Sequence, residues 1–347
     1  MLIFSVAFLK DYVTKILLAL ETPSDLADLM ADSLVGSSLT GHDSHGVTLL
    51  PGYAAAIRAG SIKPAARPTL EPATGMLATL SIDGAFGWGP VAAHFATEQV
   101  IARAQQFGVA AAVVRRCHHI GRVGQYGERM AAQNLIGIAM CNSGSGVAPF
   151  GGVKPMLGTN PIVIAVPRQG DQPPVLFDGS TSVVAGNKVR VQHDKRQPTP
   201  PGWIIDRDGQ PTTNPQDFFD GGALLPLGGH KGYALGVMVE LLGGILSGTS
   251  ASFLPDFGAT NGVLIMALRP DAFIPLDDYL VQVERACAAL KATPSSDPSR
   301  PVLLPGEPEQ NARRERMANG IPMPEAAWQA MQELAESLGV RGDSVIG

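Results

Sequence analysis

Two histidine-containing segments hold the residue types that are best suited to proton transfer. The first, GHDSHG at 41–46, places His42 and His45 around Asp43 and Ser44. Because the pKa of histidine lies near neutrality, an imidazole here can donate or accept a proton at physiological pH. The segment is also compatible with a helix N-terminus that Asp43 or Ser44 caps.

The second segment, CHHIG at 117–121, directly follows an apolar run that predicts a strand. Site residues in α/β proteins commonly lie where a strand ends in a loop, so His118 and His119 are candidates for a functional role. The alternative is a pair of loop histidines whose hydrogen bonds are satisfied locally.

Imidazole and carboxylate groups are also metal ligands, so a metal-dependent hydrolase is a competing hypothesis. Its ligands would come from His42, His45, His118, His119 and Asp178. No spacing among these residues is diagnostic of a metal site, and we predict that the protein holds no metal.

Three glycine-rich polar segments could bind phosphate or ribose. They are GGVKPMLGTNP at 151–161, FDGSTSVVAGNKV at 177–189 and LPLGGHKGYALG at 225–236. Backbone N–H groups and hydroxyls in such turns suit anionic and sugar ligands. Lys231 stands at the start of a predicted helix, where a cation opposes the helix dipole, a conflict that is typical of functional positions. Ordinary turns and a surface lysine would explain the same residues.

The elements that must position these residues alternate between strands and helices through the middle of the chain, which predicts an α/β fold. Residues 192–227 are polar and proline-rich, which predicts an extended loop. Strands are predicted at 108–117, 135–143, 160–167, 173–181, 187–192 and 261–270. Helices are predicted at 5–36, 91–107, 124–134, 228–248, 275–292 and 324–338.

Composition excludes several classes of protein. Of the 347 residues, 16% are charged and 45% hydrophobic, with 40 glycines and 28 prolines, which excludes a disordered chain or a coiled coil. A net charge of −5 gives no general attraction to nucleic acid or anionic membranes. The apolar start MLIFSVAFL is short and is followed by Lys10 and Asp11, so no membrane span is expected. Three cysteines without a C-x-x-C pair predict a reduced, cytoplasmic protein.

The glycine fingerprint of a Rossmann fold is missing. Its closest match lies at 144–152, where the third glycine of G-x-G-x-x-G is replaced by Pro149. No phosphate-binding P-loop occurs either, so any dinucleotide site must be built differently.

Considered together, the segments resemble the type-2 malate/L-lactate dehydrogenase family, which includes L-sulfolactate dehydrogenase, ureidoglycolate dehydrogenase, diketogulonate reductase and piperideine/pyrroline-2-carboxylate reductase. The resemblance extends from about residue 8 to residue 340. It rests on SLTGHDSHGV, HHIGRVGQYGERMA, PFGGVKPMLGTNPI, FDGSTSVVAGNKV, PLGGHKGYALGVMVELLGGILSG and LLPGEPEQ, in this order.

This resemblance implies a non-Rossmann, L-sulfolactate dehydrogenase-like α/β fold, with a mixed sheet flanked by helices and a helical second lobe. It predicts a substrate and dimerisation lobe of residues 1–115 plus 300–347, and an NAD(P)-binding lobe of residues 116–299. It also implies a homodimer that uses NAD(H) or NADP(H) and acts on a small-molecule substrate.

The family motifs assign roles to residues of this chain. The S-H-G motif falls on Ser44, His45 and Gly46, and implies that His45 carries the proton, with Ser44 and Asp178 as a relay. Some branches give the acid/base role to the histidine that matches His119, which leaves two candidates.

Cofactor and substrate positions follow from the same resemblance. The implied cofactor residues are His119, Ile120, Gly121, Arg122, Val123, Ser143, Thr159, Asn160, Asp178, Gly179, Ser180, Thr181, Ser182, Lys231, Pro305, Gly306 and Glu307. The implied substrate residues are Leu49, Tyr53, Thr159 and Lys231.

One departure from the family affects the substrate most. The motif usually reads S-H-G-x-x-R, whose arginine holds the substrate carboxylate, and here that position is Leu49. Either Arg58, Arg122 or Lys231 replaces it, or the substrate differs. We predict an NAD(P)H-dependent oxidoreductase for a small 2-oxo acid, 2-hydroxy acid or cyclic 2-imino acid. The alternatives are a reductase of a non-carboxylate or bulkier ketone, and a catalytically silent cofactor-binding homologue.

Overall fold

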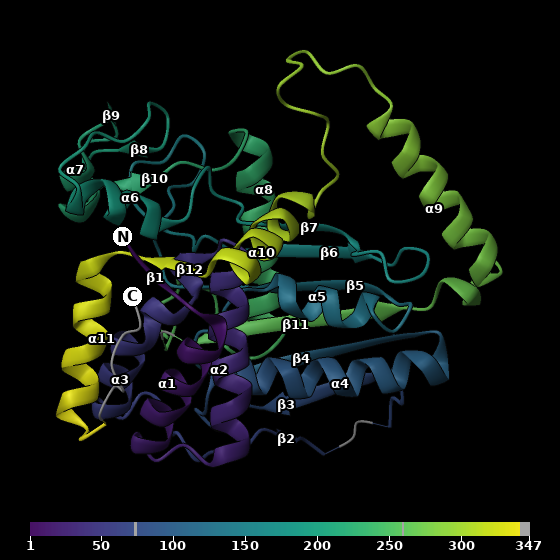
Figure 1. Ribbon diagram of the computed structural model, residues 1–347, viewed down its shortest axis with the longest axis horizontal. Helices are drawn as coiled ribbons and strands as arrows, with labels where there is room; N and C mark the ends of the chain where they lie inside the picture. Colours follow the sequence, from purple (N-terminus) through teal and green to yellow (C-terminus); the bar gives the residue numbers. More distant parts are fainter. Residues whose placement is uncertain (73–74, 259, 341–347) are drawn as a thin grey trace.

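A seven-stranded mixed sheet forms the centre of the protein, seen in the computed structural model, which describes residues 1–72, 75–258 and 260–340 (Figure 1). All neighbouring strands are antiparallel except β3 and β4, which are parallel. The predicted mixed sheet is therefore confirmed. In spatial order the strands are β2 (Thr69–Leu70), β3 (Thr79–Asp83), β4 (Val109–Cys117), β11 (Asn261–Leu268), β5 (Ile136–Cys141), β6 (Ile162–Val166) and β7 (Val175–Gly179).

Helices cover the middle of this sheet. Helix α4 (Gly89–Phe107) packs on β4 and β11, and α5 (Gly124–Ala131) packs on β5 and β6. The first five residues of β11 and its Ala267 are buried, so both faces of this central strand are covered. Strand β7 lies at the edge of the sheet, and Asp178 is its second-to-last residue.

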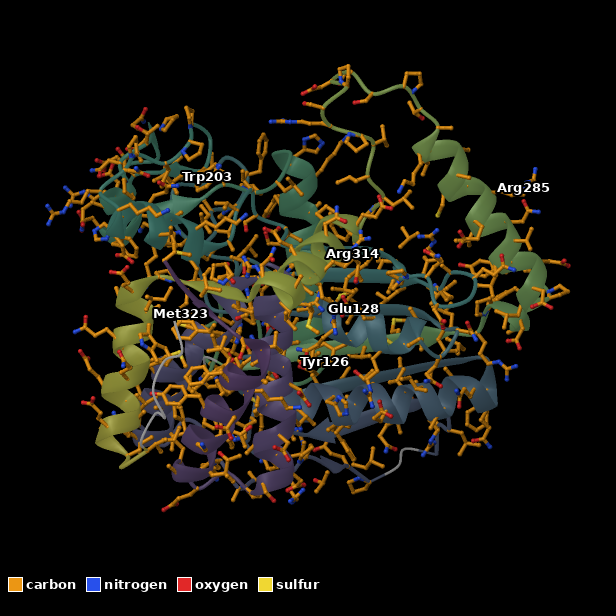
Figure 2. All side chains as sticks on the ribbon, in the orientation of Figure 1. Tyr126, Glu128, Trp203, Arg285, Arg314 and Met323 are labelled. Atoms are coloured by element: carbon orange, nitrogen blue, oxygen red, sulfur yellow. The ribbon has the colours of Figure 1, made fainter. Side chains whose placement is uncertain are left out.

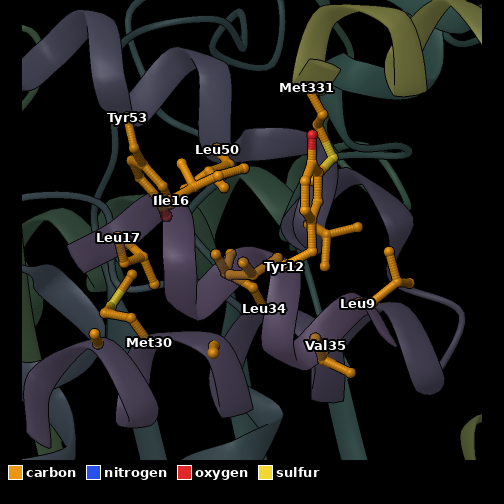
Figure 3. Close-up of a cluster of buried hydrophobic side chains, with 14 of the residues drawn as sticks. Leu9, Tyr12, Ile16, Leu17, Met30, Leu34, Val35, Leu50, Tyr53 and Met331 are labelled. Atoms are coloured by element: carbon orange, nitrogen blue, oxygen red, sulfur yellow. The ribbon is translucent and has the colours of Figure 1, made fainter. Parts of the chain in front are cut away.

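The second lobe is helical, as predicted, and joins the two ends of the described chain. Strand β1 (Leu2–Phe4) pairs antiparallel with β12 (Ile321–Met323). The helices of this lobe are α1 (Val6–Ala19), α2 (Ser24–Leu39), α3 (Leu50–Arg58) and α11 (Glu325–Ser337). They share one hydrophobic core, in which Tyr12, Leu34 and Met331 are buried (Figure 3). The helical region predicted at 5–36 forms two helices, because Pro23 interrupts the run just before α2.

Residue 115, where the two predicted lobes meet, lies within the sheet. Strand β4 spans residue 115 and pairs with both β3 and β11, so the sheet continues through that position. The core under the sheet is built from residues between Ile82 and Ala267, whereas Trp88 and Val91 pack with the buried N-terminal residues in the core of the helical lobe.

A small subdomain covers one end of the sheet. It contains β8 (Ile204–Ile205), β9 (Pro211–Thr212), β10 (Ala223–Leu224), α6 (Gly186–Asp194) and α7 (Pro215–Phe219). The strand predicted at 187–192 is wrong, since these residues form α6. Its alternating valines imitate a strand, but Val189 is buried and Val191 is exposed. The loop predicted at 192–227 also contains these short strands and α7.

Three further helices complete the fold. Helix α8 (His230–Val239) begins beside Lys231, as predicted, and continues as a π-helix, η3 (Glu240–Ile245), which packs on β11 and β5. Helix α9 (Leu276–Lys291) extends along one side of the molecule, and α10 (Glu307–Asn319) crosses toward the helical lobe (Figure 1). Among the described residues, no helix combines the length and apolar character needed to cross a membrane.

Candidate functional site

The GHDSHG segment forms two short 3₁₀ turns, η1 (Asp43–His45) and η2 (Val47–Leu49), between α2 and α3. Gly46 separates them, and a Cβ at this position would lie 2.1 Å from Ser38 Oγ of α2. Only glycine therefore lets the turns sit this close to α2. The Ser44 hydroxyl lies 2.9 Å from His45 Nδ1, which orients the ring.

His119 packs against His45 from the loop that follows β4. The two rings are stacked with their centroids 5.4 Å apart. His119 Nδ1 lies 2.8 Å from the Tyr53 hydroxyl and 3.4 Å from the Gly121 N–H. Because a backbone N–H can only donate, Nδ1 of neutral His119 accepts these hydrogen bonds and the ring proton lies on Nε2.

A cavity of about 470 Å³ lies between the helical lobe, the end of β7 and α6. This volume falls within the usual range of small-molecule sites. The predicted site residues that line it are Ser44, His45, Gly121, Arg122, Val123, Thr159, Asp178, Gly179 and Ser180. Segments distant in sequence therefore meet around one space that His45 borders.

Asp178 is a buried carboxyl group in this cavity. Its Oδ2 accepts a hydrogen bond of 3.0 Å from the Gly124 N–H and lies 3.6 Å from Arg122 Nη1. Its neighbouring imidazole is His42, whose Nε2 is 4.0 Å away. Burial raises the pKa of Asp178 to about 6, although the Arg122 charge opposes this. Asp178 therefore lies next to His42, which the sequence suggested as part of the proton-transfer segment and as a metal ligand but not as a member of the relay.

Both candidate histidines are neutral at pH 7. Burial, with smaller contributions from His42 and Arg122, lowers the pKa of His45 to about 4. Burial, with smaller contributions from His45 and His118, lowers the pKa of His119 to about 3. A neutral imidazole can act as a proton acceptor, so the free site is prepared for the direction in which a hydroxyl loses its proton.

The pH dependence of kcat/KM should report these groups. We expect oxidation to be constant from pH 8 to about pH 7, because His45 is neutral and Asp178 is mostly ionised in this range. The rate should fall as Asp178 gains a proton near pH 6 and fall further as His45 gains one near pH 4. A pH–rate profile measures this, and Asp178→Asn should remove the limb near pH 6. A profile that falls only above pH 6 would contradict the assignment.

Other predicted residues lie outside the cavity. Leu49 packs against the core of the helical lobe, and Tyr53 is buried in that core, next to Leu50 in Figure 3. Lys231 is exposed at the start of α8. The structure thus gives neither Leu49 nor Tyr53 direct access to a substrate in this cavity, although Tyr53 orients His119.

Three more predicted residues, Ser143, Asn160 and Thr181, hold Thr159 in place by hydrogen bonds, and a fourth, Ser182, lies in the same loop as Thr181. Ser143 Oγ accepts a hydrogen bond of 3.2 Å from the Thr159 N–H, and Asn160 Oδ1 accepts one from the Ser143 N–H. The Thr181 hydroxyl and N–H both donate to the Thr159 carbonyl. Ser182 is buried and donates to the Val184 carbonyl.

Glu240 is a site-supporting residue that was not predicted from the sequence. Its buried carboxylate accepts hydrogen bonds from the side chains of Asn142 and Asn160, both at 2.9 Å, and from the Gly158 N–H at 3.2 Å. The N–H and hydroxyl of Ser252 also donate to it. One carboxylate therefore fixes the loop that carries Thr159.

The same network reaches the histidine loop. The Asn261 side chain donates to the Asn142 carbonyl, and Asn261 Oδ1 accepts a hydrogen bond of 3.0 Å from the Ile120 N–H. Glu240 is thus linked through Asn142 and Asn261 to the residue beside His119. An acidic residue inside the apolar run YALGVMVELLGG was the signal that could have identified it.

Pro305, Gly306 and Glu307 line a second cavity, of about 240 Å³, on the other side of the start of α10. Pro308, the next residue, lines the first cavity. Arg168, Lys291 and Arg314 also line the second cavity. Strand β7 borders both cavities, because its Val175 lines the second cavity and its Asp178 lines the first.

Across the described parts of the chain, no group of three or more His, Cys, Asp and Glu side chains is arranged to hold a metal ion. The histidines of the site instead contact aromatic rings, hydroxyls and Asp178.

Comparison with known proteins identifies the class of protein that this fold and site define. The model of the malate/L-lactate dehydrogenase family matches residues 4–332. Hydroxycarboxylate dehydrogenase B of Escherichia coli O157:H7 is 37% identical, over 97% of this chain and 94% of its own length. An L-lactate dehydrogenase of Cupriavidus necator is 39% identical, over 94% and 95% of the two chains.

Solved structures agree with this match. Sulfolactate dehydrogenase from Methanocaldococcus jannaschii superimposes with a TM-score of 0.87 at 30% identity, covering 98% of each chain. Delta1-piperideine-2-carboxylate reductase from Pseudomonas syringae superimposes with a TM-score of 0.86 at 32% identity, over 96% of this chain and all of the other. The chain therefore belongs to the malate/L-lactate dehydrogenase family, and it is an oxidoreductase with the fold of these enzymes.

Proposed function

We propose that this protein is an NAD(P)-dependent dehydrogenase or reductase that interconverts a small 2-hydroxy acid and its 2-oxo acid, or reduces a cyclic 2-imino acid. The observation that carries the proposal is the position of His45, a neutral imidazole oriented by Ser44 at the wall of a cavity that Asp178 also lines. Relatives named as malate, lactate, sulfolactate and piperideine-2-carboxylate enzymes support the class of substrate.

His45 is the proposed proton carrier. Its Nδ1 is engaged by Ser44, so Nε2 is the atom that takes the hydroxyl proton during oxidation and returns it to oxygen or nitrogen during reduction. His119 stacks on the same ring and keeps it in place, and Asp178 supplies a carboxylate to the polar network through His42. When bound, the nicotinamide would accept or supply the hydride at the neighbouring carbon.

The residues around the two cavities suit a dinucleotide. Hydroxyls and backbone N–H groups of Thr159, Gly179 and Ser180 border the first cavity, and three cations border the second. Such groups bind sugar hydroxyls and phosphates. Gly121 to Val123 line the first cavity as well, whereas Ser143, Asn160 and Thr181 would act by fixing Thr159.

A turnover screen tests the proposal. The purified chain is mixed with NADH or NADPH and a panel of 2-oxo acids, cyclic imino acids and matched uncharged ketones, and loss of the reduced cofactor is followed by absorbance. We expect turnover with at least one acid. Activity confined to uncharged ketones, or cofactor binding without turnover of any compound, would overturn the proposal.

We further propose that two copies of the chain associate through α8 and η3. Six apolar side chains of α8, η3 and the residue that follows η3 are between 39% and 58% exposed: Leu235, Met238, Leu241, Leu242, Ile245 and Leu246. A contiguous apolar surface of this kind is typical of an interface, and two identical faces can cover each other around a two-fold axis.

The free, buried thiols of Cys117, Cys141 and Cys287 support a reducing cytoplasmic environment.

The Leu242→Lys variant should shift the protein from dimer to monomer in sedimentation velocity, because an unpaired charge would be buried at the interface. The matched control is Leu290→Lys on α9, which replaces another exposed leucine outside this surface. A wild-type protein that sediments as a monomer would contradict the proposed interface.

A further inference from the structure

Arg122 is a buried cation at the wall of the His45 cavity. Its side chain is only 3% exposed. One end of the guanidinium, Nη2, donates a hydrogen bond of 2.5 Å to Glu128 Oε2. Figure 2 labels Glu128 on α5, where this helix meets the helical lobe. The other terminal nitrogen, Nη1, lies on the side of Asp178, a residue that borders the cavity.

The bonding of this guanidinium is incomplete. Within the described residues, Nη1 and Nε of Arg122 have no hydrogen-bond partner, and the Asp178 carboxylate remains 3.6 Å from Nη1. A buried N–H group without a partner costs free energy, so such donors are normally satisfied by protein, water or ligand. The local backbone leaves room for this arrangement, because a Cβ at Gly124 would lie 2.5 Å from Nη1.

Arg122 lines the same cavity as His42 and His45, and the Asp178 carboxylate lies 3.6 Å from Arg122 Nη1 and 4.0 Å from His42 Nε2. After burial, its charge is a cause of the lowered pKa of His42, and it contributes after burial and His42 to the lowered pKa of His45. A ligand group that binds Nη1 would therefore lie near the proton carrier, as the carboxylate of a 2-hydroxy acid must, since it is attached to the reacting carbon.

The other candidate cations fit this role less well. Arg58 donates to Ser337 on the surface of the helical lobe, and Lys231 is exposed at the start of α8. Lys188 lines the cavity but is exposed on α6, where water competes for its charge. Leu49 packs against the hydrophobic core of the helical lobe and has no charge. Arg122 is thus the buried cation among the described lining residues.

We propose that Arg122 binds the carboxylate of the substrate through Nη1. This inference rests on the proposed function and assigns Arg122 to the acid rather than to the cofactor, where the family resemblance placed it. A charged hydrogen bond in a buried site discriminates strongly between a carboxylate and an uncharged group of the same shape.

The test compares each accepted 2-oxo acid with its methyl ester or amide. Arg122→Met should raise KM for the acid by about 10- to 100-fold, the loss expected for a charged hydrogen bond, and change KM for the ester by less than about threefold. Arg122→Lys should retain part of the affinity, and added guanidinium ion should partly restore Arg122→Met. An equal fall of kcat for acid and ester, with KM unchanged, would show that Arg122 only positions Asp178 and would overturn the proposal.

Two controls keep the test decisive. Lys188→Met should leave KM for the acid within about threefold, and a large rise there with none in Arg122→Met would transfer the role to Lys188. Arg122→Met leaves the Glu128 carboxylate unpaired. If this variant does not fold, the same KM comparison is made with the double variant Arg122→Met/Glu128→Gln.

Calorimetry separates this inference from the proposed function. Oxamate, an unreactive analogue of a 2-oxo acid, should bind wild-type protein and bind the Arg122→Met variant at least tenfold more weakly. If no acid is turned over but oxamate binding depends on Arg122, the proposed function fails, whereas the assignment of Arg122 as the carboxylate-binding residue stands. Oxamate binding that is equal in both proteins, or no oxamate binding at all, would overturn the assignment of Arg122 as the carboxylate-binding residue.

Discussion

Replacing His45 by asparagine should lower kcat by about 10²- to 10⁴-fold, the usual contribution of a general acid or base. Asparagine keeps much of the ring's volume and one polar atom near Ser44, so the cavity should stay folded while proton transfer is lost. KM should change little, because His45 acts on the reacting oxygen or nitrogen more than on the bound acid. Steady-state kinetics in both directions measure the effect.

Two matched variants identify the acid/base residue. His94→Asn on α4 alters a partly buried histidine outside the cavity and should leave kcat within about twofold. His119→Asn should lower kcat less than His45→Asn, because His45 lines the cavity whereas His119 packs against the His45 ring. If the His119 variant loses more activity than the His45 variant, His119 is the proton carrier.

Replacing Glu240 by alanine should destabilise the protein by about 3–5 kcal/mol, in the range found when a buried charged network loses one partner. Donors from Asn142, Gly158, Asn160 and Ser252 would all lose their acceptor inside the protein. Each unsatisfied buried donor adds to the cost. Thermal and urea unfolding measure it, and a fall in Tm of roughly 5–15 °C is expected.

Controls for Glu240 separate charge from shape. Glu240→Gln keeps the shape but turns an N–H group toward these donors, so it should lose about half as much stability. Glu315→Ala changes an exposed glutamate of α10 and should stay within about 0.5 kcal/mol of wild type. A Glu240→Ala protein within about 1 kcal/mol of wild type would show that the network does not hold the two site loops.

The sequence predicted the parts of the fold that depend on local patterns. Apolar runs such as those of β4, β5 and β11 identified buried strands, and the amphipathic pattern of α9 identified a helix. It failed where the pattern was ambiguous, as at α6, whose alternating valines resemble a strand. The helical region predicted at 5–36 contains both α1 and α2, which Pro23 separates.

The site could be predicted by resemblance but not by spacing. Motifs identified Ser44, His45, Thr159 and Asp178, and all four line one cavity. Local sequence could not show that Leu49 faces the core, because η2 sets the direction of its side chain. It could not place Glu240 beside Asn142 and Asn160 either, because these residues are 80 or more positions apart in the chain.

A crystal structure of the protein with oxamate and NADH or NADPH tests the central claim most directly. We predict that the carbonyl oxygen of oxamate lies about 2.6–3.2 Å from His45 Nε2, the distance needed for proton transfer. The nicotinamide ring should lie in the same cavity, next to the carbonyl carbon. An oxamate bound in this cavity with its carbonyl oxygen on another group, and with His45 out of reach, would contradict the account.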